Sequence, residues 1–190
     1  GIFTGSSQKS LALENKAIYL QWKKFINGDT DLDTTITSQE TLNEWRHCKA
    51  LKIDPFKKLN NIALAGNALK EKLHQNEAFI NISQPFIHKL FRFMKDFSYA
   101  VGLFDRDGYL LKVITEEKFR NNNMMFNFFI GTRWTEKDAG NSCASHILDK
   151  KRPKQVIGAN HYLKIFHLIA ASGAPITAPD GELLGGIIVT

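Results

Sequence analysis

Apolar residues recur at helical spacing through the first half of the chain. Leu13, Ala17, Ile18, Leu20 and Phe25 form an approximate helical stripe, which predicts a helix that ends at Gly28. Ser38 and Thr41 predict the start of a second helix, because a serine side chain accepts a hydrogen bond from the first unpaired backbone N–H groups of a helix. Asp54-Pro55 then ends that helix.

Residues 59–98 read as linking amphipathic helices. One long helix is predicted by the apolar positions Leu59, Ile62, Ala63, Leu69, Leu73 and Phe79. Ser83 predicts the start of the next helix, with Pro85 in its first turn, where a missing N–H costs little.

From Tyr99 onward the apolar period changes from helical to strand-like. Two turns, Asp105–Gly108 and Ala178–Gly181, each contain Asp-Gly between β-rich runs, which is a strong hairpin signal. The predicted strands around these turns cover residues 99–104 and 109–115, then 174–177 and 183–189.

The segment between the hairpins is predicted to be irregular. It holds a Phe-, Asn- and Met-rich stretch and a glycine-punctuated loop, then a short helix at 141–149 and a strand at 155–158. Helices followed by paired strands indicate an α+β fold with an antiparallel sheet. The order is not an alternating βαβ array, which argues against a Rossmann or TIM fold.

Composition narrows the class of protein. Apolar residues make up 43% and charged residues 23% of the 190 residues, as in globular proteins. The net charge of +6 is spread over both halves, and the densest basic run, residues 150–154, is typical of a solvated loop. No charge-free apolar run approaches the ~18 residues of a membrane span. With two separated cysteines and no signal-peptide pattern, we expect a cytoplasmic chain without membrane contact.

No motif for catalysis or cofactor binding stands out. P-loop, GxGxxG, HExxH and GxSxG patterns are absent. Four residues could meet at a metal site or supply a Cys/His nucleophile pair: Cys143, His146, His161 and His167. Nothing at recognisable spacing supplies an oxyanion hole or an orienting acid for such a pair. We therefore expect no enzyme, no metal and no cofactor.

Several short motifs follow one another along the chain. They are Trp45-Arg46-His47-Cys48, Ile53-Asp54-Pro55, Leu103–Gly108, Gly131–Ser142, Gly158-Ala159-Asn160-His161-Tyr162, Ala174-Pro175-Ile176, and Asp180-Gly181 with Leu184-Gly185. Each is weak alone. Their order and spacing over residues 42–190 resemble the GAF sensor domain of bacterial sigma-54-dependent transcriptional activators, of the acetoin-catabolism and dihydroxyacetone regulator type.

The sequence departs from that pattern at three places. Asn141-Ser142 replaces Thr-Asn, Asn160 replaces the Glu before the histidine, and Ala171 replaces a Cys before the Ala-Pro-Ile strand. Because these positions are expected to face the pocket, the identity of a ligand does not carry over from the family.

The resemblance implies a GAF-like (PAS-related) fold, with an antiparallel sheet of about six strands, helices on one face and a ligand cavity under loops on the other. It divides the chain into an N-terminal helical region (1–58), linking helices (59–98) and a sensor domain (99–190). Helices that flank such domains commonly dimerise, so a homodimer is expected; alternatively they pack on their own sheet. In the full regulators an AAA+ ATPase and a helix-turn-helix follow, so DNA is expected to be contacted only through such further domains.

The resemblance also points to ligand-binding residues: Phe129, Trp134, Ser142, Cys143, Asn160, His161, Ala171 and Ser172. Trp134 could stack on a ligand or anchor its loop to the core. His161 suits recognition of a small polar molecule, but a structural histidine bonded to the backbone fits equally well. Phe129, with its neighbours Phe126 and Phe128, could form a cavity wall or plain core.

Two functions follow as hypotheses. In the first, a non-catalytic sensor binds an unidentified small metabolite and signals through its flanking helices. In the second, the domain docks a partner protein and its cavity is closed. A cavity of several hundred Å³ with convergent polar groups would favour the first. A collapsed, Phe-filled interior with an exposed apolar patch would favour the second. A GAF-type methionine-sulfoxide reductase is a remote third, because Cys143 is the lone cysteine near the site.

Overall fold

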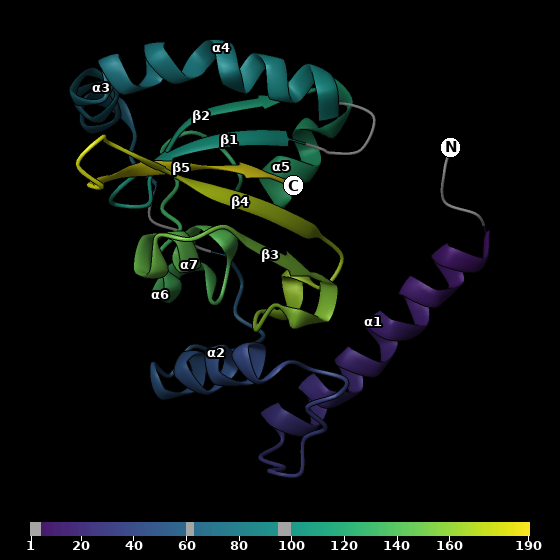
Figure 1. Cartoon of the computed structure of the whole chain (residues 1–190). Helices are drawn as coiled ribbons and strands as arrows, with labels where there is room; N and C mark the ends of the chain where they lie inside the picture. Colours follow the sequence, from purple (N-terminus) through teal and green to yellow (C-terminus); the bar gives the residue numbers. More distant parts are fainter. Residues whose placement is uncertain (1–4, 60–62, 95–99) are drawn as a thin grey trace.

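A five-stranded antiparallel sheet forms the centre of the molecule (Figure 1). The computed structural model describes residues 5–59, 63–94 and 100–190. The strand order is β2-β1-β5-β4-β3, and every neighbouring pair is antiparallel. The strands are β1 (Ala100–Asp105), β2 (Leu110–Thr115), β3 (Lys154–Ile157), β4 (Ala170–Thr177) and β5 (Leu183–Val189). The predicted α+β class is confirmed, with five described strands where about six were expected.

Both predicted hairpins are present. At the first turn, Asp105 Oδ1 accepts hydrogen bonds from the backbone N–H groups of Asp107 and Tyr109, at 3.0 and 2.9 Å. Gly108 follows with a φ of +88°, a conformation that glycine adopts without strain. The predicted strand start at Tyr99 lies outside the described residues.

Two helices, α3 (Gly66–Gln75) and α4 (Glu77–Met94), cover one face of the sheet (Figure 1). Ile87 of α4 is 1% exposed and packs with Val101, Leu103 and Leu111 in a separate small core. These residues alternate along their strands with residues that face the other side of the sheet. The linking helices therefore pack on their own sheet, which was one of the two arrangements expected for them.

The sequence placed the boundaries of these helices wrongly. The first begins at Gly66 and not at Leu59, and Ala63 instead forms an isolated bridge with Thr132. Ile62 lies outside the described residues. The second helix runs unbroken through Ser83 and Pro85. Pro85 has no N–H to bond the carbonyl of Asn81, and both residues are exposed. The packing of the helix on the sheet offsets this cost.

The opposite face of the sheet carries the short helices and loops. These are η1 (Glu117–Phe119), α5 (Arg120–Met125), α6 (Glu136–Ala139), α7 (Cys143–Lys150), η2 (Gly158–Asn160) and η3 (Lys164–Phe166). Ser142 caps α7 by accepting from the Ser145 N–H at 3.2 Å, so the helix predicted at 141–149 is present. The stretch expected to be irregular contains η1 and α5.

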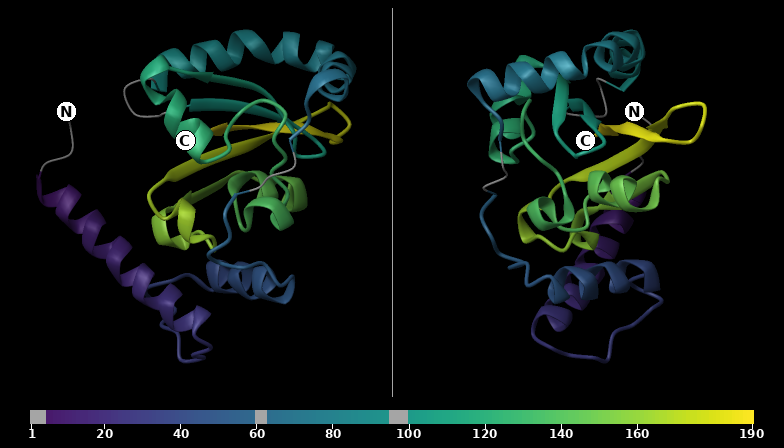
Figure 2. Two further views of the ribbon diagram at one scale, coloured as in Figure 1. Left: turned by 180° about the vertical axis from the view of Figure 1, so that it is seen from behind. Right: turned by 90° about the vertical axis from the view of Figure 1, so that its left-hand side faces the viewer.

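The N-terminal helices α1 (Gly5–Ile26) and α2 (Gln39–Ala50) pack beyond this second layer (Figure 1). The predicted cap is confirmed, since Ser38 Oγ accepts from the Thr41 N–H at 3.2 Å. Trp22 and Trp45 are 1% and 0% exposed within the main core. The N-terminal end of α1 projects away from the body of the molecule (Figure 2). Among the described residues, no helix combines the length and apolar character needed to cross a membrane.

The packing of α4 is tested by two of its isoleucines. Ile87 is 1% exposed and Ile82 is 70% exposed. We expect Ile87→Ala to lower the free energy of unfolding by about 2–5 kcal/mol, because it leaves a cavity against the sheet. Ile82→Ala should change it by less than about 0.5 kcal/mol at low protein concentration. Urea denaturation followed by circular dichroism measures both, and equal losses would contradict this orientation of the helix.

Candidate functional site

A buried irregular segment, residues 158–163, forms one side of the candidate site. Its backbone carbonyls are paired by side chains from the N-terminal helices. Trp22 Nε1 donates to the Tyr162 carbonyl at 2.9 Å, and Trp45 Nε1 donates to the Asn160 carbonyl at 2.8 Å. The Asn141 side chain donates to the same Asn160 carbonyl and accepts from the Tyr162 N–H. His161 is thereby held on a rigid backbone.

The opposite side is the loop that carries Trp134. The Trp134 N–H donates to the Gly108 carbonyl at 2.8 Å, and the Gly131 N–H donates to the Leu110 carbonyl at 2.7 Å. On the other edge of the loop, the Gly131 carbonyl accepts a hydrogen bond of 2.8 Å from the Leu64 N–H. The indole N–H donates to Thr132 Oγ1. The tryptophan ring is therefore fixed at both its backbone and its polar end.

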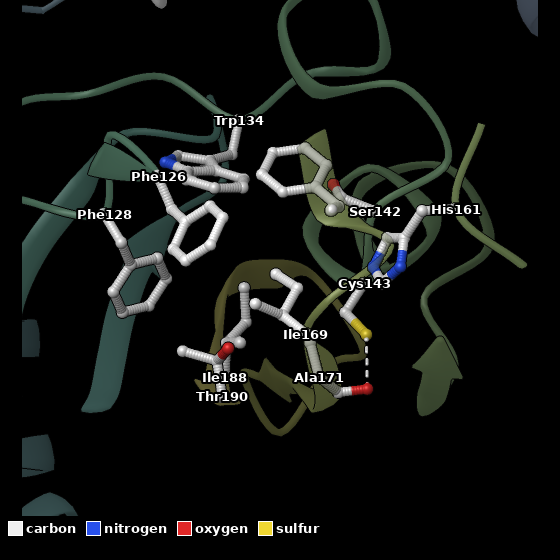
Figure 3. Close-up of a pocket in the computed structure, with 11 residues that line it drawn as sticks. Phe126, Phe128, Trp134, Ser142, Cys143, His161, Ile169, Ala171, Ile188 and Thr190 are labelled. Carbon is white, nitrogen blue, oxygen red and sulfur yellow. Dashed lines mark hydrogen bonds between the residues drawn. The ribbon is translucent and has the colours of Figure 1, made fainter. Parts of the chain in front are cut away.

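A cavity of about 40 Å³ lies between these two segments and the sheet (Figure 3). Its lining is Phe126, Phe128, Trp134, Ser142, Cys143, His161, Phe166, Ile169, Ala171, Ile188 and Thr190. The Trp134 ring packs against Phe128 and Phe166, with centroids 5.6 Å apart in each case. None of these lining residues carries a charged side chain. At roughly 10–15 Å³ for each water-sized group, the volume holds three or four such groups.

The imidazole ring of His161 lines this apolar cavity. It is 2% exposed, and its Nδ1 lies 2.9 Å from the Gly158 carbonyl. A carbonyl only accepts, so Nδ1 carries the proton and Nε2 keeps a free lone pair. No described residue donates to Nε2. Burial lowers the pKa of His161 to about 4, so the ring is neutral at physiological pH.

The Cys143 thiol at the cavity lies within hydrogen-bond distance of two backbone carbonyls. Cys143 Sγ lies 3.2 Å from the Ala171 carbonyl (Figure 3) and 3.3 Å from that of Lys154. Burial raises the pKa of the Cys143 thiol to about 12, and burial likewise raises the pKa of Cys48. Both thiols are therefore protonated at neutral pH, whereas a nucleophilic cysteine must be a thiolate.

Five of the eight residues proposed from the sequence meet at this cavity: Trp134, Ser142, Cys143, His161 and Ala171. Three lie elsewhere. Ser172 is exposed and bonds Gln155, because successive residues of a strand point to opposite faces. Phe129 is not among the residues that line the cavity, whereas Phe126 and Phe128 are. Asn160 bonds the Ile157 carbonyl through its amide nitrogen.

Four lining residues were not proposed from the sequence: Phe166, Ile169, Ile188 and Thr190. Alternation along β5 could have separated Ile188 from its neighbours Ile187 and Val189, which face α4. The sequence does not say which side of the strand carries the cavity. Phe166 and Ile169 lie in a turn with no periodic signal at all.

Of the four residues considered for a metal site, Cys143 and His161 line the same cavity, and the other two have separate surroundings. His146 Nδ1 lies 3.4 Å from Glu44, and His167 packs edge-on against Trp22 at 4.6 Å. Among the described residues, Glu40, Glu44 and His146 do lie within reach of one ion. Lys154 Nζ already contacts both carboxylates, at 3.2 and 2.6 Å, and its hydrogen bond lowers the pKa of Glu40. The ammonium group of Lys154 thus supplies a positive charge to these two carboxylates.

The chain was compared with known proteins. It is 27% identical over 169 residues to the acetoin dehydrogenase operon transcriptional activator AcoR of Bacillus subtilis, covering 89% of this chain and 28% of AcoR. It is 23% identical over 118 residues to a signal-transduction and transcriptional-control protein of Clostridium beijerinckii, covering 62% of this chain and 19% of that protein. The chain is homologous to bacterial transcriptional activators. This confirms the resemblance drawn from the motifs, although no family model matches.

A solved structure supports the same assignment at the level of the fold. The Escherichia coli DhaR(N)–DhaL complex contains a chain that superposes with a TM-score of 0.73 at 15% identity, covering 78% of this chain and 51% of that one. The fold is therefore GAF-like. The chain spans about a quarter of the length of the curated transcriptional regulators that it matches.

The buried histidines predict how stability depends on pH. Burial lowers the pKa of both His161 and His167 to about 4, against roughly 6.5 in an unfolded chain. Between these values the unfolded state binds more protons, so the free energy of unfolding falls as the pH decreases from 6.5 to 4. Each histidine contributes up to about 3 kcal/mol to that loss.

The variant His161→Gln should remove the contribution of His161 to this pH-dependent loss of stability. We expect the loss of stability between pH 7 and pH 4.5, measured by urea denaturation, to shrink by about 2 kcal/mol relative to the native sequence. Carboxyl groups contribute equally to both proteins and cancel in the comparison. An unchanged loss would show that the His161 ring is accessible to protons in the folded state.

Proposed function

We propose that this chain is the non-catalytic sensory region of a bacterial transcriptional regulator, and that its cavity binds a small neutral metabolite. The observation that carries the proposal is the neutral ring of the buried His161, whose Nε2 keeps a lone pair at an apolar cavity beneath Trp134. A ligand that donates one hydrogen bond to this nitrogen would gain about 0.5–1.5 kcal/mol from it.

The chemistry of the lining sets the class of ligand. With no charged side chain among the lining residues and a neutral His161, a carboxylate or an amine would lose its hydration without compensation. A hydroxyl group on a short carbon skeleton satisfies both the lone pair and the aromatic walls. The volume suits a molecule of about three or four non-hydrogen atoms, and a larger one requires the Trp134 loop to shift.

The relatives support a regulatory role and leave the ligand open. AcoR is named for an operon of acetoin metabolism, which is consistent with a small neutral ligand. Ala171, Asn160 and Ser142 differ from the family pattern in or near the cavity. We therefore propose the ligand class from the cavity and not from the relative's name.

The signal would leave through the helices that flank the sheet. A ligand that prefers one arrangement of Trp134 shifts the balance between arrangements that already exist. The division into residues 1–58, 59–98 and 99–190 stays a prediction, as do a cytoplasmic location and control of an ATPase and a DNA-binding domain outside this sequence.

A second candidate function is docking of a partner protein. The cavity is well below the several hundred Å³ typical of ligand pockets, and three phenylalanines line it. The similar chain DhaR(N) was solved as a complex with the protein DhaL. A groove of about 480 Å³ beside α1, whose lining mixes apolar residues such as Ile165 and the exposed Leu168 with polar ones such as Lys164, offers a surface for such a partner.

Ligand binding in the cavity, and its loss when a larger side chain fills the cavity, distinguishes the two candidate functions. Thermal unfolding would be followed with a panel of C2–C4 alcohols, diols and hydroxyketones, and with acetate and ethylamine as charged controls. A ligand at 100 times its Kd adds about 2.7 kcal/mol, or roughly 5–10 °C in Tm. We expect a shift with a hydroxylated compound, none with the charged ones, and its loss in Ala171→Leu.

The matched control is Ser172→Leu, one residue along β4 and on the opposite face. It should keep the ligand shift in full. A shift that survives Ala171→Leu would place the binding site outside this cavity. A flat response across the panel, with a protein partner captured through the groove beside α1, would favour docking.

A further inference from the structure

The aromatic cavity and the groove beside α1 share a wall. Part of it is the turn around η3, where Phe166 and Ile169 line the cavity while Ile165 and Leu168 line the groove. Among the described residues, Phe126 alone lines both spaces (Figure 3). The side chain of Phe126 is therefore the part of the wall that the cavity and the groove have in common.

Phe126 is held less firmly than the other aromatic rings of the cavity. Phe128, Trp134 and Phe166 are buried, and the ring centroids of both phenylalanines lie 5.6 Å from that of Trp134. Phe126 is only half-buried, and its ring centroid lies 6.4 Å from that of Phe166. Because attraction between non-bonded atoms falls steeply with distance, moving the Phe126 ring costs less than moving its neighbours.

The backbone around Phe126 allows its ring to move while the core stays in place. Met124 and Met125, at the end of α5, are 56% and 59% exposed. On the other side, the Asn127 side chain donates to the Leu59 carbonyl at 3.1 Å and so anchors the chain directly after Phe126. A change of side-chain rotamer would therefore carry the ring toward the groove without a shift of the backbone.

The rest of the cavity lining is better closed. Apart from Phe126, only Ile169 and Thr190 among the lining residues are not buried. The Ile169 N–H donates to the Phe166 carbonyl, and the Ile169 carbonyl accepts from the Gly158 N–H. The N–H and carbonyl of Thr190 both pair with Ala100 of β1, at 3.0 and 3.1 Å. Access at these two positions would break backbone hydrogen bonds, whereas access at Phe126 needs only a side-chain movement.

The two spaces differ in size and in polarity. The cavity holds three or four water-sized groups, whereas the groove, at about 480 Å³, is as large as many ligand pockets. The groove carries the Lys164 ammonium group and the Tyr19 hydroxyl, which lie 3.0 Å apart. A small polar molecule thus meets hydrogen-bonding groups in the groove before it reaches the apolar cavity.

We propose that Phe126 determines which molecules reach the cavity: its ring closes the route from the groove and sets the upper size of a bound ligand. The inference rests on the proposed function for the identity of the molecule that enters. The barrier itself is a property of the wall, so it can be tested without that ligand.

Labelling of Cys143 measures access to the cavity, because its thiol lines that space. Methyl methanethiosulfonate is a small neutral thiol reagent, and mass spectrometry follows its reaction. We expect Phe126→Ala to label Cys143 at least ~10-fold faster than the native sequence does, since the larger side chain no longer blocks the route. Phe129→Ala is the matched control. It removes a half-buried phenylalanine three residues away that lines neither space, and it should leave the rate unchanged.

Cys48 distinguishes local access from unfolding. It is buried and free like Cys143 but lines neither the cavity nor the groove. Phe126→Ala should leave its labelling rate unchanged. Labelling of Cys143 should also be insensitive to low urea concentrations, because a local opening exposes little new surface. An unchanged Cys143 rate in Phe126→Ala, or equal acceleration at both cysteines, would overturn the inference.

Alcohols of increasing length test the size limit. In the native sequence we expect the largest shift in Tm with C2–C4 compounds. In Phe126→Ala the largest shift should move to longer ones, such as 1-hexanol and benzyl alcohol, which fit the joined space. Faster labelling of Cys143 with no shift for any alcohol in either protein would refute the proposed function and confirm the barrier. Faster labelling with an unchanged length preference would overturn Phe126 as the determinant of ligand size.

Discussion

The structure depends on how the buried carbonyl groups of residues 158–163 are satisfied. An irregular segment inside a core cannot pair its own backbone groups as a helix or strand does, so side chains must do it. The indole N–H groups of Trp22 and Trp45 serve this purpose from two separate helices. The N-terminal helices are therefore part of the same core as the sheet. The orientation of His161 follows from their packing, because a displaced Trp45 would leave the adjacent Asn160 carbonyl with only the Asn141 amide.

The sheet separates two environments, and the loop that holds Trp134 contacts elements on both sides of it. On one face is the aromatic cavity, and on the other are α3 and α4. The loop that holds Trp134 is bonded to Leu64, just ahead of α3, and also to the first hairpin. The same hairpin is tied to α3 by Lys72, whose Nζ lies 2.7 Å from Asp105 Oδ2. The loop that holds Trp134 is therefore in contact both with the residue that precedes α3 and with the hairpin that Lys72 of α3 reaches.

The sequence predicts well what is decided locally, as the Asp105–Gly108 turn and the Ser38 cap show. Local rules fail at Pro85, which lies inside α4 and does not begin a helix. The free-energy cost of a proline there depends on solvent exposure and on packing against the sheet, and neighbouring residues in the sequence reveal neither. The site residues also differ in how well the sequence predicts their positions. The family motifs brought His161 and its partners to one cavity, because a family pattern carries tertiary information that periodicity lacks. Ser172 was misplaced by one position on a strand, and a shift of one residue reverses the face.

The neutral state of the His161 ring is consistent with the other features of the cavity. A charged imidazole in this cavity would face three phenylalanines and a tryptophan with no counter-ion among the lining residues, so burial keeps the ring deprotonated at Nε2. The Gly158 carbonyl then fixes which nitrogen carries the proton, and the lone pair remains on Nε2. The same burial that would make the proposed site selective for neutral hydrogen-bond donors disfavours the charged form on which the acid–base chemistry of histidine depends. The proposed recognition role therefore rests on the environment of the ring and not on the residue type alone.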